Sequence, residues 1–153
     1  MKHTLEQLRA EIIYVPETGT FVRKSGKKST GTPNNNGYLN IRVLNKTYYA
    51  HRLAYLLHHG ELPEMLDHIN QDKADNRICN LRPATASQNK ANVKVRSDST
   101  TGLKGVRPYR DKFRATITEH GKRYHLGTFN SAIEAHCAYK GASIIMFGEF
   151  ACH

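Results

Sequence analysis

The first sixty residues alternate between helical and strand-like hydrophobic patterns. Apolar residues recur at helical spacing over residues 5–15, which predicts a short amphipathic helix. A turn and a strand follow, and residues 24–37 have the composition of a loop. Apolar and polar residues alternate over residues 38–49, which predicts a β-hairpin. Residues 51–59 then predict a helix that Gly60 would end.

The next segment, LDHINQDKADNRICNLRP (residues 66–83), is polar and carries one Asp-His pair. We predict a strand over residues 65–69, a loop, and a second strand over residues 78–82. Thr85 or Ser87 can cap a helix that runs to about residue 95. These three elements would form a small ββα motif.

The pattern changes after residues 97–102, whose composition is typical of a linker. Three short stretches predict an antiparallel sheet over residues 105–129. Ser131 and Glu134 have capping-box spacing, which predicts a helix that runs to about Phe147. The helix face that packs on the sheet is expected to carry Ala135, Ala138, Ala142 and Ile145.

The formal net charge of +10 is spread along the 153 residues and favours a polyanionic partner over a membrane. Solubility alone is the alternative explanation. No apolar run approaches the roughly 18 residues of a membrane helix, and no signal peptide is recognised, so we expect a cytoplasmic protein that is not secreted. Cys79, Cys137 and Cys152 are scattered without a CxxC pair, so no structural zinc is expected.

The Asp-His pair suits phosphodiester hydrolysis. The Asp67 carboxylate could hold a hard divalent cation, and the His68 imidazole could take a proton from water near neutral pH. An amide oxygen from Asn89 could be a second ligand of the cation, and Asn80 could fix the orientation of the His68 ring. The alternative is an ordinary asparagine-rich loop beside a chance Asp-His pair.

The same residues resemble a known family. DHIN, DNR and NLR, followed by Asn89 eight residues after Leu81, resemble the HNH endonucleases of the phage and intron-associated homing type, which have a ββα-metal fold. The resemblance covers roughly residues 8–96. It implies that Asp67 and Asn89 bind the metal, that His68 is the general base and that Asn80 orients it. Asn76 is the alternative orienting residue, although it is expected to shape the loop.

Residues 102–151 resemble an AP2 domain, with GLKGVRPYR at the start and FGEFA at the end. In that family a three-stranded sheet enters the DNA major groove and a helix packs behind it. On the central strand the alternation turns Phe113, Ala115 and Ile117 toward the helix. The resemblance implies DNA contacts from Lys104, Arg107, Tyr109, Arg114, Thr116, Thr118, Arg123 and His125. Because the chain has no Trp, the base preference of the plant members cannot be transferred.

Several other polar residues have two interpretations. Arg77 and Arg82 either contact phosphate or pair with Asp72 and Asp75. The cations after the motif either contact the DNA backbone, which we favour, or form a solvated face; they are Lys90, Lys94 and Arg96. Three histidines are expected to be packing or surface residues: His51, His58 and His59.

The sequence therefore predicts an α+β protein in four parts. They are a helix and loop lead-in (1–37), an HNH module with its hairpin (38–96), a linker (97–102) and an AP2-like domain (103–153) whose three-stranded antiparallel sheet packs on one helix. The expected function is a metal-dependent DNA endonuclease that uses Mg²⁺, with Mn²⁺ as the alternative. The expected partner is double-stranded DNA, bound by a monomer, with a dimer as the alternative. One site per chain fits nicking by a monomer, and double-strand cleavage would need a second site. The rival hypothesis is a non-enzymatic DNA-binding protein with a silent HNH fold.

Overall fold

The computed structural model describes residues 3–153 and divides the chain into two compact units. One unit ends at Pro83 and the other begins at Ala84. The linker was expected further along, at residues 97–102. The division falls earlier because Ala91, in the helix after the boundary, packs with Ile117 and Phe147 of the second unit. The two units are described separately.

The first unit begins with a helix that is shorter than the sequence suggests. α1 spans Leu5–Glu11, and Thr4 caps it through a capping box with Gln7. The helix predicted over residues 5–15 is wrong beyond Glu11, because the chain becomes extended at Ile12. A small antiparallel sheet of order β1-β2-β3 follows: β1 (Ile12–Val15), β2 (Thr20–Arg23) and β3 (Lys28–Ser29).

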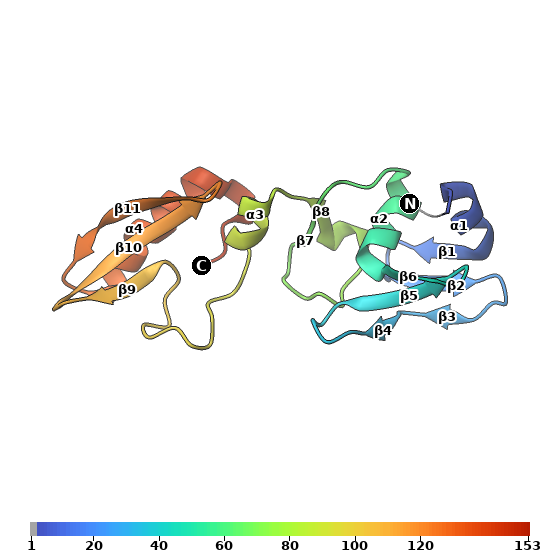
Figure 1. Cartoon of the computed structure of the whole chain (residues 1–153), viewed down its shortest axis with the longest axis horizontal. Helices are drawn as coiled ribbons and strands as arrows, with labels where there is room; N and C mark the ends of the chain where they lie inside the picture. The colour runs from blue at the N-terminus through green and yellow to red at the C-terminus, as the bar shows by residue number, and fades with distance from the viewer. Residues whose placement is uncertain (1–2) are drawn as a thin grey trace. The chain divides into compact units, whose positions relative to one another are not determined.

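A second sheet and one helix complete the core of the first unit (Figure 1). The predicted hairpin is confirmed, with Val43 paired with Lys46 at its closed end. Gly60 ends the following helix in the left-handed conformation, as the sequence predicts. Leu8 and Phe21 are completely buried in this core, and Ile41 and Leu53 nearly so. The elements are β4 (Thr32–Pro33), β5 (Leu39–Val43), β6 (Lys46–Tyr49) and α2 (Ala50–His59).

The motif segment forms a two-stranded ladder of β7 (Leu66–His68) and β8 (Leu81–Pro83). The predicted second strand over residues 78–82 is wrong at its start, where Ile78–Asn80 forms the 3₁₀ helix η1. The helix after it, α3 (Ala86–Ala91), is capped by Thr85 through a capping box and ends before residue 95. α3 belongs to the second unit.

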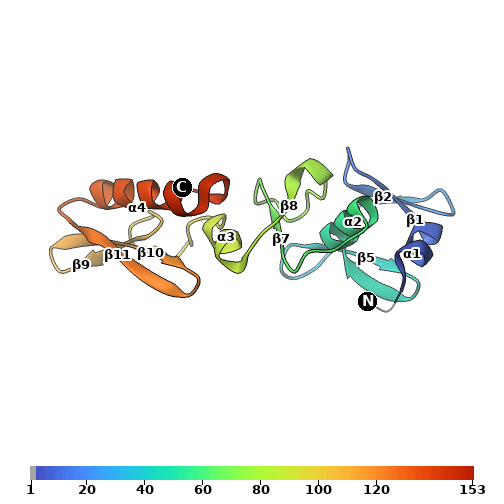
Figure 2. The same cartoon turned by 90° about the horizontal axis from the view of Figure 1, so that it is seen from above.

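The second unit is a three-stranded antiparallel sheet with a helix along one face (Figure 2). Ala115 and Ile117 are buried against this helix, as the alternation predicts. Ala135 is buried too, but Ile145 is 86% exposed, so its placement on the packed face is wrong. Its elements are β9 (Val106–Tyr109), β10 (Lys112–Glu119), β11 (Lys122–Phe129), α4 (Ala132–Phe147) and η2 (Gly148–Phe150).

Among residues 3–153, no helix combines the length and the apolar character that crossing a membrane requires.

Candidate active site and nucleic-acid interface

Asp67 and His68 are neighbours on β7, and both are buried. The antiparallel register places Arg82 of β8 directly opposite Asp67, and Leu81 opposite His68. A short ladder thus brings one carboxylate, one imidazole and one guanidinium into the interior of the first unit. Buried ionised groups require a partner, so the pairing within this ladder decides what the site can do.

Arg82 is the partner of Asp67. Its Nε and Nη2 each donate to Asp67 Oδ2 at 3.0 Å. The side chains are only 11% and 5% exposed, so this ion pair is largely desolvated. The sequence left two interpretations for Arg82, a phosphate contact or a pair with Asp72 or Asp75; the structure shows a pair, but with Asp67.

Arg77 forms the pair that the sequence offered for it. Its Nη2 lies 2.6 Å from Asp75 Oδ2, and its Nε donates to Asp75 Oδ1 at 2.8 Å. Hydrogen bonds from Arg77 hold the pKa of Asp75 at about 2. The Arg77 side chain is half exposed, so the pair lies at the surface of the motif loop.

The His68 ring contacts the amide of Asn76. His68 Nε2 lies 3.4 Å from Asn76 Oδ1, and Asn76 Nδ2 donates to the Ala74 carbonyl at 3.2 Å. The amide is therefore oriented with its oxygen toward the ring. With that oxygen as acceptor, Nε2 carries the ring proton and Nδ1 is the basic nitrogen. Burial lowers the pKa of His68, and the Asn76 hydrogen bond opposes part of that effect.

Asn80 braces the loop of the motif. Its Oδ1 accepts from the Asn70 N–H at 2.9 Å, and its Nδ2 donates to the Asp75 carbonyl at 2.8 Å. The sequence assigned the orienting role to Asn80 and the loop role to Asn76, and these contacts have the opposite arrangement. The physical reason is η1, a 3₁₀ turn in place of an extended strand, which turns Asn80 toward the loop.

The N-terminal hairpin, formed by β1 and β2, supports the backbone around Asn76. Tyr14 Oη donates to the Asn76 carbonyl at 2.7 Å, and the Ile78 N–H donates to the Pro16 carbonyl at 3.1 Å. Gly19, with φ +69°, lies so close that a Cβ there would be 2.7 Å from Arg77 N. The lead-in of the chain is thus part of the scaffold of the candidate site.

His51 lies beside His68, a position that the sequence did not reveal. It is the second residue of α2 and is 8% exposed, and its ring lies edge-on to His68 with centroids 5.1 Å apart. Its Nδ1 is buried and has no hydrogen-bond partner among the described residues. Burial, with a smaller contribution from His68, lowers the pKa of His51 to about 3. His51 is therefore a neutral imidazole at physiological pH, and packing, one of its two expected roles, fits its burial.

The predicted metal ligands differ in where they lie. Asp67 belongs to the first unit, and Asn89 lies half-buried on α3 in the second unit. Within residues 3–153, no group of three or more His, Cys, Asp or Glu is arranged to hold a metal ion. A carboxylate or an amide oxygen, each taken by itself, is a suitable ligand for a hard divalent cation such as Mg²⁺. Arg82 already supplies a positive charge at Asp67, so a cation there would compete with it.

The second unit presents its polar residues on the open face of the sheet. Cross-strand pairing places Arg114 opposite Arg107 on β9, and Thr118 opposite Arg123 on β11. Thr116 pairs with His125 directly beside a β-bulge. Arg107, Thr118, Arg123 and His125 are all exposed. These four predicted groove-facing residues therefore share one accessible surface.

Tyr109 and Arg114 contact each other on this face. The guanidinium carbon of Arg114 lies 3.5 Å from the centroid of the Tyr109 ring, a cation–π contact. Arg114 Nε is buried without a hydrogen-bond partner among the described residues. This stacking fixes the plane of the guanidinium on the sheet surface.

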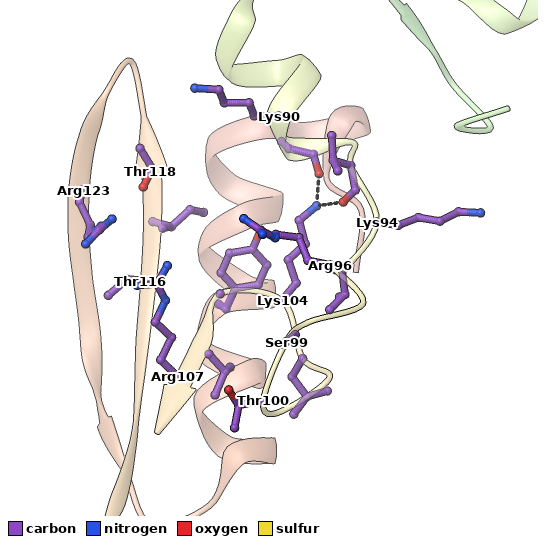
Figure 3. Close-up of a pocket in the computed structure, with 18 of the residues that line it drawn as sticks. Lys90, Lys94, Arg96, Ser99, Thr100, Lys104, Arg107, Thr116, Thr118 and Arg123 are labelled. Carbon is purple, nitrogen blue, oxygen red and sulfur yellow. Dashed lines mark hydrogen bonds between the residues drawn. The ribbon is translucent and has the colours of Figure 1, made fainter. Parts of the chain in front are cut away.

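Beside the sheet lies an open groove of about 650 Å³ (Figure 3). Arg107, Thr116, Thr118 and Arg123 line it from the sheet, and Lys90, Lys94 and Arg96 from α3 and the segment that follows. We call this feature the basic groove. Arg96 pairs with Asp98, Nη2 to Oδ2 2.7 Å, whereas Lys90, Lys94, Arg107 and Arg123 form no ion pair within the described chain.

Lys104 lines the basic groove but has a structural role in it. Its Nζ donates to the carbonyls of Ala91, Val93 (2.6 Å) and Cys152 (3.3 Å). In Figure 3 dashed lines join its Nζ to oxygens near the end of α3. These bonds satisfy carbonyls at a helix C-terminus. Burial lowers the pKa of Lys104. This geometry therefore disfavours the DNA contact predicted for Lys104.

The family comparison matches the second half of the first unit and the start of the second. Residues 48–91 match the family described as HNH endonuclease, so the chain carries an HNH endonuclease domain there. The matched range contains His51 as well as the Asp67–His68 pair and Asn89. It ends at residue 91, so the AP2 resemblance of the second unit stays a prediction.

Two viral proteins are similar to the chain. An uncharacterized HNH endonuclease of Acanthamoeba polyphaga mimivirus is 31% identical over 105 residues, which are 66% of this chain and 54% of that protein. Protein 3.8 of Escherichia phage T7 is 33% identical over 70 residues, which are 43% of this chain and 58% of that protein. The matches thus span little more than half of these relatives. No solved structure matches the chain significantly.

Proposed function

We propose that the chain is a metal-dependent DNA endonuclease that hydrolyses phosphodiester bonds. The observation that carries the proposal is the buried Asp67–His68 pair inside the HNH domain, with the His68 ring contacting the Asn76 amide. A neutral imidazole held by one nitrogen has its other nitrogen directed for proton transfer. Both relatives are viral and one is a phage protein, which supports a phage origin. With that origin the chain would act on DNA in the host cytoplasm.

In the proposed reaction His68 takes the proton of the attacking water at Nδ1, while Nε2 keeps its contact with Asn76. The low pKa of His68 keeps the ring in the neutral, proton-accepting form. Asp67 and Asn89 would hold a divalent cation, most simply Mg²⁺ with Mn²⁺ as the alternative. That cation would stabilise the charge developing on the phosphate and on the leaving oxygen.

The second unit supplies DNA binding in this proposal. The open sheet face, with Arg107, Arg114 and Arg123, would read base edges or hold phosphates as in an AP2-like domain. The basic groove adds Lys90, Lys94 and Arg96 as backbone contacts. One candidate catalytic site per chain fits nicking of one strand by a monomer.

One observation favours a second candidate function. Arg82 neutralises the carboxylate that the metal requires, as expected for a DNA-binding protein that retains a silent HNH fold. If the chain is an endonuclease, the Arg82–Asp67 ion pair has to break or loosen when the cation binds Asp67. The two proposals therefore make different predictions: the endonuclease cleaves DNA with a divalent cation and His68, and the silent DNA-binding protein leaves the DNA intact.

The test is incubation of the chain with double-stranded genomic DNA of its source, in Mg²⁺ or in EDTA, followed by mapping of the new ends. The endonuclease produces ends in Mg²⁺ only, and His68→Ala lowers the rate by about 10²–10⁴-fold with DNA affinity retained. Cleavage that survives EDTA would remove the metal mechanism. DNA that is bound but stays intact under both conditions would leave the silent DNA-binding protein.

A further inference from the structure

The rings of Tyr38, Tyr49 and His51 form a cluster that the His68 ring joins through Tyr38 and His51. The Tyr38 ring lies 6.0 Å from the His68 ring between centroids, and Tyr49 lies 5.7 Å from Tyr38. His51 contacts all of them, at 5.0 Å from Tyr38, 5.6 Å from Tyr49 and 5.1 Å from His68. A continuous series of rings therefore leads from the proposed general base to the surface.

The outer end of this series is open to solvent. Tyr49 is 44% exposed, although it lies at the end of β6, directly before the buried first turn of α2. Lys73 places its Nζ 4.8 Å from the Tyr38 centroid and donates to the Asn36 carbonyl at 3.0 Å. The surface beside His68 thus combines flat aromatic faces with one cation. We call Tyr38, Tyr49 and Lys73 the aromatic platform.

Core packing does not explain the platform. Tyr48, the preceding residue on β6, packs partly buried against the hydrophobic core, and side chains of successive strand residues point to opposite faces. Tyr49 therefore faces away from the core and toward the His68 side. His51 buttresses the rings from inside, and its buried Nδ1 lacks a partner among the described residues. A buried polar atom without a hydrogen-bond partner costs free energy, and one explanation for such an atom is a role in function.

We propose that the aromatic platform binds one base of the DNA, next to the scissile phosphate, after that base has left the helical stack. Base stacking on exposed aromatic side chains and a nearby cation for the backbone are the usual elements of such contacts. The positive charge of the chain favours a nucleic acid over an apolar peptide on this surface. The inference rests on the proposed function, because it places the DNA strand at His68.

The test uses the full-length His68→Ala chain, so that no cleavage occurs, and a duplex in which 5-iododeoxyuridine replaces thymidine. Irradiation links this base to an aromatic ring stacked on it, and peptide mapping identifies the linked residue. We expect the link at Tyr49 or Tyr38. Tyr49→Ala should remove most of it and weaken DNA binding by roughly 5- to 150-fold, whereas Tyr49→Phe should keep both within about twofold, since a phenyl ring still stacks.

A matched control lies on the same sheet. Lys46 places its Nζ 5.4 Å from the Tyr48 centroid, the same kind of contact on the other side of the strand. Lys73→Met should weaken DNA binding more than Lys46→Met does. DNA that is retained but linked only outside residues 38–49 would overturn the platform and leave the endonuclease proposal standing. A chain that retains no DNA would contradict the endonuclease proposal as well.

Discussion

The two units use their charged residues in opposite ways. In the first unit the key charges are buried and paired, with Asp67 held by Arg82 and the neutral His68 placed beside Asn76. In the second unit Arg107 and Arg123 are exposed and unpaired within the described chain. Chemistry requires fixed, desolvated groups, whereas binding a polyanion requires accessible cations. In the proposed function this contrast corresponds to chemistry at Asp67 and His68 in the first unit and to cation contacts with DNA in the second.

The largest effect should come from breaking the buried pair in the first unit. Arg82→Met leaves the Asp67 carboxylate without this cation, which should lower the free energy of unfolding by roughly 3–5 kcal/mol. Arg77→Met, which breaks the surface pair with Asp75, should have only a small effect. Thermal unfolding measures both variants. If Asp67 is a metal ligand, Mg²⁺ should raise the melting temperature of Arg82→Met more than that of the wild type; equal shifts would argue against cation binding at Asp67.

The next effect distinguishes the two asparagines of the motif. Asn76→Ala removes the amide that contacts His68 Nε2 and should lower the single-turnover cleavage rate by about 10–100-fold, as losses of orienting partners do. Asn80→Ala should mainly lower stability, because Asn80 bonds to the loop backbone. The measurement is the cleavage rate at saturating DNA together with the melting temperature. A larger rate loss in Asn80→Ala would restore the orienting role to Asn80.

A smaller effect tests whether the N-terminal hairpin supports the site. In Gly19→Ala the added Cβ would clash with the backbone of Asn76 and Arg77. In Gly26→Ala, where φ is also positive (+79°), the added Cβ has no atom within 4 Å. Both changes carry the backbone cost of a positive φ, about 1–2 kcal/mol. Only Gly19→Ala should also lower the cleavage rate, because it displaces the Asn76 segment. Equal rates in the two variants at a temperature where both are folded would show that the hairpin only adds stability.

The pH dependence of stability should report the buried histidines. The pKa of His51 falls from 6.5 to about 3 on folding, so the unfolded chain binds more protons between these values. Stability should therefore decrease as the pH falls from 6.5 toward 3. His51→Phe removes this titration and should flatten the acid limb in urea titrations at a series of pH values. An unchanged slope would mean that other groups dominate acid unfolding.

The sequence predicted the order of the elements better than the contacts around them. Periodicity predicted the hairpin and the second sheet, Gly60 marked the end of α2, and the capping-box spacing of Ser131 and Glu134 predicted α4. The predictions failed at Ile12, where the chain pairs with β2, and at Ile78, whose N–H donates to the Pro16 carbonyl. Ile145 has a helical spacing that matches the packed face, yet it lies outside it.

The candidate site shows the same division. Asp67 and His68 were selected through the resemblance of DHIN, DNR and NLR to the HNH endonucleases, because their chemistry alone left a chance Asp-His pair as the alternative. The partner of Asp67 could not be predicted, because it depends on the register of β7 with β8. The contacts of His51 with His68 and of Lys104 with three carbonyls link residues far apart in the chain. One sequence carries no signal for either contact.

The proposed separation of chemistry at His68 from the cation contacts with DNA is tested most directly by two measurements. They are DNA binding at several salt concentrations and the single-turnover cleavage rate. The wild type is compared with His68→Ala and with a chain in which Lys94, Arg107 and Arg123 are each changed to Gln. We predict that His68→Ala keeps the salt slope and loses the rate. The triple variant should lose roughly 0.9 of the slope per phosphate contact removed and keep the rate at saturating DNA. The opposite assignment, with the slope changed by His68→Ala and unchanged by the triple variant, would contradict the separation of chemistry from DNA binding.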